Sequence, residues 1–86
     1  MFKSEEKKNI KEAASMLRKI ADKIEEGKVV FKRGEEEVEL QIPSNLTVEI
    51  KVEEEEKERT KRSFEIELEW VEGVDGVEGA SSVVVE

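Results

Sequence analysis

The sequence predicts an α+β domain of two layers, in which one amphipathic helix packs on a four-stranded antiparallel meander sheet. Two observations support this prediction. Apolar residues recur every three or four positions between residues 9 and 26, which is the period of a helix. After Gly27 the period changes to two over four segments, as expected for half-buried strands. A sheet with one apolar face needs a cover, and the chain offers one amphipathic helix.

The helix is expected to begin at Asn9 and to end before Gly27. Glu12 follows Asn9 at the spacing of a capping box, and the apolar stripe starts directly after Asn9. Ser4 offers an earlier cap, but it lies too far before the stripe, so the segment around it is expected to be extended. Gly27 can take the left-handed conformation that ends helices. The apolar stripe consists of Ile10, Ala13, Ala14, Leu17, Ile20, Ala21 and Ile24.

The four predicted strands are short segments of alternating polarity, at residues 28–33, 37–42, 46–53 and 64–70. A turn at Gly34 links the first two. A turn of Pro43, Ser44 and Asn45 links the second and third. The charged segment "EEEEKERTKR" before the fourth strand is expected to be a solvated loop or an extension of the strands.

The strand register is expected to keep apolar residues opposite one another. This places charged side chains in rows across the outer face of the sheet. One row alternates in sign and forms a ladder of ion pairs, whereas the next sets three glutamates side by side, which costs stability. The predicted pairs are Phe31 with Val38, Leu40 with Val48, and Ile50 with Ile66; the alternating row is Lys32, Glu37, Lys51 and Glu65.

The three neighbouring glutamates, Glu39, Glu49 and Glu67, are the candidate metal-binding residues. Oxygen ligands of this kind suit a hard cation such as Ca²⁺ or Mg²⁺. The same row could instead meet a basic partner surface, or keep the open face solvated and block unwanted strand pairing.

Trp70 ends the fourth predicted strand with the parity of the apolar face. One interpretation is that it closes the core at the end of the helix, with its indole N–H bound to a polar group at the rim. The other is that it anchors a protein interface, where tryptophan is enriched.

The domain is expected to span residues 1–73, and residues 74–86 are expected to form a flexible acidic tail. Glycine recurs at every third position from Gly73 to Gly79, which favours flexibility. The alternative is that the valine run 83–85 adds a strand to a sheet edge.

Composition excludes several functions. The 86 residues contain no cysteine and no histidine, which removes disulfides, thiolate metal sites and the commonest general base. We therefore expect no enzyme and no cofactor. Residues 1–33 carry ten basic and six acidic side chains (+4), and residues 34–86 carry five and seventeen (−12), which gives the net charge of −8. This acidic half disfavours nucleic acid as a partner.

The chain also lacks a signal-like apolar run and any apolar stretch of the ~20 residues that a membrane span needs. A soluble, cytoplasmic protein with no membrane partner is the expectation. Charged residues make up 44% of the chain and are mostly Glu and Lys, a composition typical of thermophiles.

The order of these features resembles the Amphi-Trp domain family, small archaeal and bacterial domains. The resemblance covers about residues 2–71 and rests on "AASMLRKIADKIEEG", on "IPSNLTVEIKVE" and on the final "FEIELEW". It implies the fold predicted above and a prokaryotic source, for which an archaeal thermophile is the expectation. It implies no biochemical activity.

The expected function is therefore that of a small, non-enzymatic interaction module, bound to a protein partner or weakly self-associating as a homodimer. The alternative is low-affinity binding of a divalent cation on the acidic sheet face.

Overall fold

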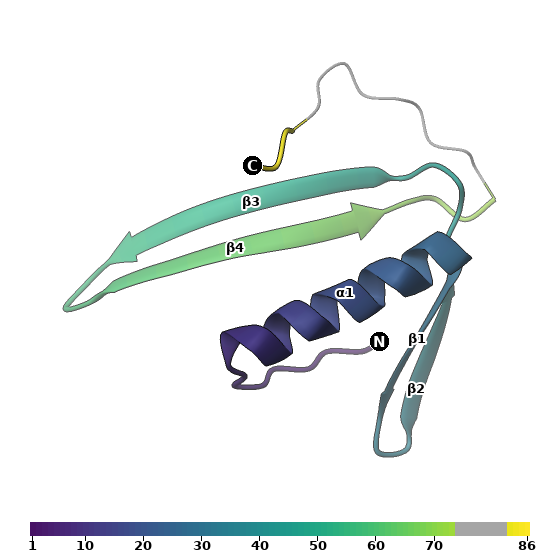
Figure 1. The fold of residues 1–86 in the computed structure, drawn as a ribbon, viewed down its shortest axis with the longest axis horizontal. Helices are drawn as coiled ribbons and strands as arrows, with labels where there is room; N and C mark the ends of the chain where they lie inside the picture. The colour runs from purple at the N-terminus through teal and green to yellow at the C-terminus, as the bar shows by residue number, and fades with distance from the viewer. Residues whose placement is uncertain (74–82) are drawn as a thin grey trace. The chain divides into compact units, whose positions relative to one another are not determined.

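The computed structural model describes residues 1–73 and 83–86. In chain order it contains a helix α1 (Ile10–Glu26) and four strands, β1 (Lys28–Arg33), β2 (Glu36–Gln41), β3 (Thr47–Glu56) and β4 (Thr60–Glu69) (Figure 1). The chain divides into two compact units, Met1–Ile42 and Pro43–Glu86, which are described separately below. The α+β class and the four antiparallel strands predicted from the sequence are confirmed.

Both ends of α1 are capped as the sequence predicts. The side chain of Asn9 accepts a hydrogen bond of 2.8 Å from the backbone N–H of Glu12, which is otherwise unpaired in the first turn. The Asn9 amide also donates to the Glu12 carboxylate, which closes the pair. At the other end Gly27 takes a φ of 88°, and its N–H donates to the carbonyl of Ile24 at 3.0 Å.

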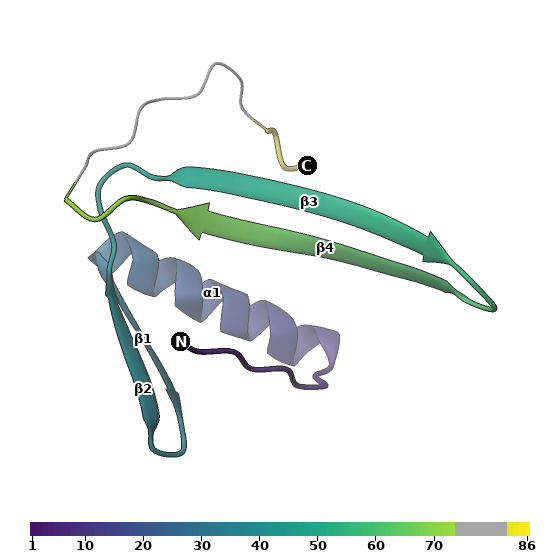
Figure 2. The same cartoon turned by 180° about the vertical axis from the view of Figure 1, so that it is seen from behind.

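The segment before Asn9 is not helical, as expected, and it runs alongside α1 (Figures 1 and 2). The Phe2 ring lies 6.0 Å from that of Phe31 on β1. The Arg33 guanidinium lies 5.5 Å above the Phe2 ring and donates a 2.9 Å hydrogen bond to the carbonyl of Lys3. These contacts hold the segment against the first hairpin.

Strands β1 and β2 form a hairpin in the predicted register, with Phe31 opposite Val38. Gly34 has a φ of 59° in the two-residue link, where tight hairpin turns need a positive φ. Val29, on β1, is the one buried apolar side chain of the described residues, at 5% exposure. The core of this unit is therefore small.

The apolar stripe of α1 is only partly covered. Ala13, Ala14, Ile20 and Ile24 are half-buried, whereas Leu17 is 50% exposed and Ile10 is 88% exposed. The expectation that the whole stripe packs on a sheet is therefore not confirmed.

Strands β3 and β4 form the second hairpin, with Ile50 opposite Ile66 as predicted. The charged segment between the predicted strands is mainly a strand extension, because β3 continues to Glu56 and β4 begins at Thr60. Only three residues form the turn, in which the N–H of Lys57 donates to the carbonyl of Arg59 at 3.3 Å.

The four strands lie in two separate two-stranded sheets, so the single four-stranded meander is not confirmed. The predicted pair of Leu40 with Val48 is absent from the described pairing, where Leu40 faces Val29 and Val48 faces Leu68. Two features disfavour the missing pairing. Pro43 in the link has no N–H to donate, and a β2–β3 pair would set glutamate-rich strands side by side.

The predicted tail falls mostly outside the described residues. The valine run at 83–85 is described and has no regular secondary structure, and its side chains are exposed. Among the described residues, no helix has the length and apolarity needed to cross a membrane.

Candidate functional site: the apolar face of the second hairpin

The β3–β4 hairpin has two chemically different faces, because side chains alternate along each strand. Cross-strand pairs bring the apolar positions of both strands to one side. The other side carries polar and charged residues only. We call the apolar side, formed by Val48, Ile50, Val52, Phe64, Ile66 and Leu68, the hairpin face.

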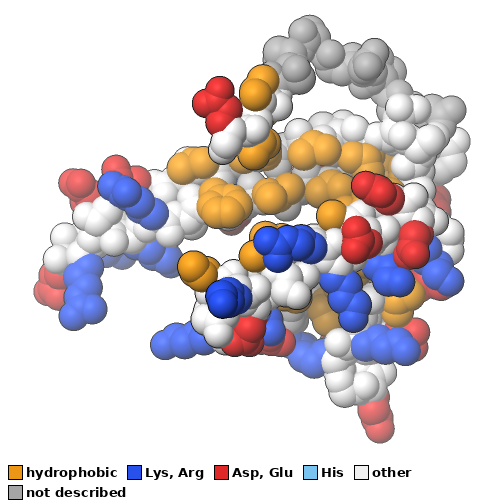
Figure 3. Space-filling view, viewed as in Figure 1, with side chains coloured by type: hydrophobic (Ala, Val, Ile, Leu, Met, Phe, Trp, Pro, Cys, Tyr) orange, Lys and Arg blue, Asp and Glu red, His pale blue; other side chains and the backbone are white. Residues whose placement is uncertain are grey.

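Most of the hairpin face is open. Its members Val48, Ile50, Val52, Phe64 and Ile66 are 43–76% exposed. Figure 3 shows apolar side chains gathered along this hairpin. Soluble monomers seldom expose contiguous apolar patches beyond a few hundred Å², and larger patches usually mark interaction sites.

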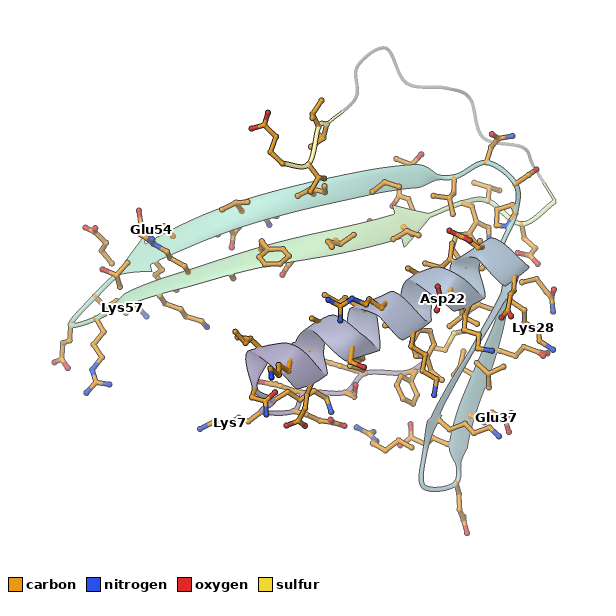
Figure 4. The ribbon with its side chains drawn as sticks, viewed as in Figure 1. Lys7, Asp22, Lys28, Glu37, Glu54 and Lys57 are labelled. Atoms are coloured by element: carbon orange, nitrogen blue, oxygen red, sulfur yellow. The ribbon has the colours of Figure 1, made fainter. Side chains whose placement is uncertain are left out.

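An ion pair closes the hairpin face toward the turn. Arg62 and Glu54 are opposite each other, with 3.1 Å between Nε and Oε1. Figure 4 shows Glu54 near the end of β3, close to the turn that holds Lys57. The apolar surface is thus bounded by one acidic and one basic side chain on neighbouring strands.

Trp70 lies at the other end, directly after β4, and is half-buried. Its indole Nε1–H donates to the carboxylate of Glu72 at 3.4 Å. The predicted polar partner for the indole is therefore present. Whether Trp70 also anchors a partner stays a prediction.

The polar face contains the predicted pair of Lys51 and Glu65, which are opposite each other. Lys51 makes its ion pair with Glu53, two residues along its own strand, at 2.9 Å. The hydrogen bond to Glu53 and the charge of that residue raise the pKa of Lys51, and the charge of Glu65 raises it further. Lys51 thus interacts with two acidic neighbours, Glu53 on its own strand and Glu65 on β4.

Farther along the polar face, Glu49 is opposite Glu67, as predicted. A hydrogen bond with Glu69 and the negative charge of Glu69 raise the pKa of the Glu67 carboxyl. The sequence did not lead us to expect Glu69 as the neighbour with the largest effect on the pKa of Glu67. The signal was present, because residues two apart on one strand lie on the same face.

The candidate metal ligands belong to both hairpins. Glu49 and Glu67 are paired in the second hairpin, whereas Glu39 is on β2, where its carboxylate lies 3.3 Å from the ammonium of Lys28. Across residues 1–73 and 83–86, no three acidic side chains are grouped so as to hold a metal ion. The three-glutamate site stays a prediction.

A groove of about 500 Å³ lies between α1 and β1 in the first unit. Its lining includes the apolar residues Met16, Ile20 and Phe31 and four lysines. Three of these lysines are paired with glutamates, which reduces the positive charge available to a ligand. The pairs are Lys23 with Glu26, Lys28 with Glu39, and Lys32 with Glu37, at 3.2, 3.3 and 4.0 Å.

These features define a chain of the α+β class with one capped helix and two amphipathic hairpins, the second followed directly by a tryptophan. The chain belongs to the Amphi-Trp domain family, which matches residues 1–86. The match is longer than the segment of about residues 2–71 on which the resemblance rested. Comparisons with curated proteins and with solved structures found no match.

Proposed function

We propose that this chain is a small, non-enzymatic interaction module and that the hairpin face is its binding surface. One observation carries the proposal: five large apolar side chains on one side of one hairpin are 43–76% exposed. A two-stranded hairpin is marginally stable in water without a cover on its apolar side. A partner that covered this side would stabilise the hairpin and remove apolar surface from water.

The available chemistry supports a binding role over catalysis. The chain has neither histidine nor cysteine. Acid–base catalysis by paired carboxylates needs two groups in different environments, one of them partly buried. Glu49, Glu65, Glu67 and Glu69 are all exposed. The excess of Glu and Lys supports our proposal of a thermophilic source. We also propose a cytoplasmic location and, from the membership in the Amphi-Trp domain family, an archaeal source.

The arrangement expected from the sequence, with α1 on one face of a four-stranded sheet, is the competing proposal. A helix of the same chain that covered the hairpin face would close this face to partners. The two proposals therefore predict opposite accessibility at the same side chains.

Thiol labelling separates these proposals, because the chain has no cysteine of its own. Val52→Cys places a thiol on the hairpin face, and Ser63→Cys places a control thiol on the polar face one row away. Both variants are labelled with a small thiol reagent at low protein concentration. We expect the two thiols to react at similar rates.

A Val52→Cys thiol that reacts far more slowly than Ser63→Cys at the lowest concentration would overturn the proposed function. The hairpin face would then be covered within a single chain. Circular dichroism of both variants establishes that they retain the native secondary structure.

A second candidate function is low-affinity binding of a divalent cation at Glu39, Glu49 and Glu67. The pairing of Glu49 with Glu67 favours it, because this pairing sets two carboxylates side by side, with Glu69 two residues farther along β4. A bound cation would raise the melting temperature by mass action. The test compares Ca²⁺ or Mg²⁺ with NaCl at equal ionic strength, for the wild type and for Glu67→Lys. Equal effects of the salts on the wild type would remove this candidate.

A further inference from the structure

Two of the three cross-strand pairs of the hairpin face are unequal in size, and the ion pair that bounds this face joins opposite charges. The smaller Val52 on β3 is opposite Phe64 on β4, and the acidic Glu54 is opposite the basic Arg62. Val48 is likewise opposite the larger Leu68, and the central pair joins Ile50 to Ile66. The small and acidic members lie on β3, and the large and basic members lie on β4.

We propose that the hairpin face binds the same face of a second copy, about a two-fold axis that runs parallel to the strands. This proposal rests on the proposed function and names its partner. Rotation about such an axis lays β4 of the second copy over β3 of the first and keeps the position along the strand. Each residue then meets a copy of its own cross-strand partner, as an interface with two-fold symmetry allows.

The contacts made in this way are complementary. Val52 meets Phe64 of the second copy, so a small side chain meets a large one. Ile50 meets Ile66 of the second copy at the centre. Glu54 meets Arg62 of the second copy, so the ion pair that bounds each hairpin face becomes part of a four-charge cluster with alternating sign. Complementary charges of this kind fix register and orientation.

The other two-fold arrangement is less favourable. An axis across the strands, centred on the pair of Ile50 and Ile66, would lay β3 over β3 in opposite directions. Glu54 would then meet Leu46 of the second copy in place of a basic group. Burying a carboxylate against an apolar side chain without a new partner costs free energy. Charge therefore selects the axis parallel to the strands.

The apolar area of the hairpin face determines how strong the self-association is expected to be. Five half-exposed apolar side chains present an apolar area on the order of 500 Å², near that of the largest patch on a typical monomer. Two copies would bury roughly 1,000 Å², which lies at the low end of specific interfaces. The turn regions that lie side by side carry five acidic and four basic side chains over residues 53–62, or −1 each, so they repel little. We expect a weak dimer.

Helix α1 is the weaker candidate for the same surface. Four residues of its stripe, Ala13, Ala14, Ile20 and Ile24, are already half-buried, which leaves Ile10, Leu17 and Ala21 as the exposed stripe residues. A second hairpin face offers larger side chains, in complementary positions.

A charge-reversal pair tests the arrangement. Glu54→Arg sets arginine against Arg62 of the second copy, and Arg62→Glu sets glutamate against Glu54 of the second copy. Each variant alone is therefore expected to lose association, as measured by sedimentation equilibrium of the full chain. In an equimolar mixture, each copy of one variant meets opposite charges on the other. The mixture is expected to associate as the wild type does.

Two controls sharpen the experiment. The double variant carries both reversals and so restores every contact between opposite charges. It is expected to associate like the wild type, which would show that the reversed side chains do not prevent folding. The single variants change the net charge from −8 to −6 and to −10, so the mixture has the same mean charge as the wild type.

Two results would overturn the proposal. If the wild type associates but the mixture does not regain association, the axis is wrong. If the wild type stays monomeric at millimolar concentration while the Val52→Cys thiol reacts freely, the partner is another molecule and only the proposed function survives.

Discussion

Glu65 and Glu67 lie two residues apart on one strand, yet their neighbours differ in charge. Glu65 is opposite Lys51, whereas Glu67 is opposite Glu49 and has Glu69 as its neighbour two residues along β4. Glu65→Lys is expected to lower the melting temperature by opposing Lys51, and Glu67→Lys to raise it by relieving repulsion. Both side chains are exposed, so the shifts are expected to be small and to shrink with added salt. Equal shifts in thermal melts of the two variants would contradict the register.

The raised pKa of Glu67 has a consequence for pH dependence. A carboxyl whose pKa is higher in the folded state binds its proton more tightly there than in the unfolded chain. Its contribution to stability is therefore present at low pH and is lost as the pH rises through the raised pKa. Between the ordinary value of 4.5 and that raised pKa, the wild type is expected to gain stability on acidification relative to Glu67→Gln. Parallel urea-unfolding curves at several pH values check this, and an identical pH dependence of the two proteins would contradict it.

At the scale of the elements, the cap of α1 is the feature that the sequence predicted most completely. Asn9→Ala removes the acceptor for the N–H of Glu12 and is expected to lower the free energy of unfolding by about 1 kcal/mol. Ser4→Ala is the matched control, since Ser4 was the alternative cap and lies outside the helix. Urea denaturation measures both. A larger loss for Ser4→Ala would show that the helix begins earlier.

The helix and strands were predictable because their signals are local. Period, caps and turn residues placed α1 from Ile10 to Glu26 and both hairpin registers, including Lys51 opposite Glu65. The expected meander depended on Leu40 pairing with Val48, which no local signal specifies. The link between β2 and β3 contains Pro43 and joins strands of like charge, and both features disfavour pairing of β2 with β3.

At the scale of the whole molecule, the candidate site depends on how far its apolar side chains are exposed to solvent. The alternating pattern does not predict this exposure. The pattern showed that Val52 and Phe64 share a face, and it assigned that face to a core. The structure leaves both side chains more than half exposed. The sequence therefore predicted the composition of the hairpin face, whereas its exposure came from the structure.

The net charge of the whole molecule also affects its self-association. Each copy carries −8, so two copies repel one another at long range, and salt screens this repulsion. Burial of the apolar faces depends much less on salt. Self-association through the hairpin face is therefore expected to strengthen from low to moderate salt. Association that weakens steadily with salt, measured by light scattering over a concentration series, would indicate instead that attraction between basic and acidic regions holds the copies together.

If the hairpin face is open in the single chain and is covered by a partner on association, the exposure of its methyl groups depends on protein concentration. The most direct measurement is the effect of a soluble paramagnetic agent on methyl resonances, followed over a dilution series of the wild type. At high dilution the methyl groups of Val52 and Ile66 are expected to be broadened nearly as strongly as those of exposed Ile10, and far more than those of buried Val29. At high concentration Val52 and Ile66 are expected to become protected while Ile10 does not. Protection of Val52 and Ile66 equal to that of Val29 at every concentration would show that the hairpin face is covered within a single chain.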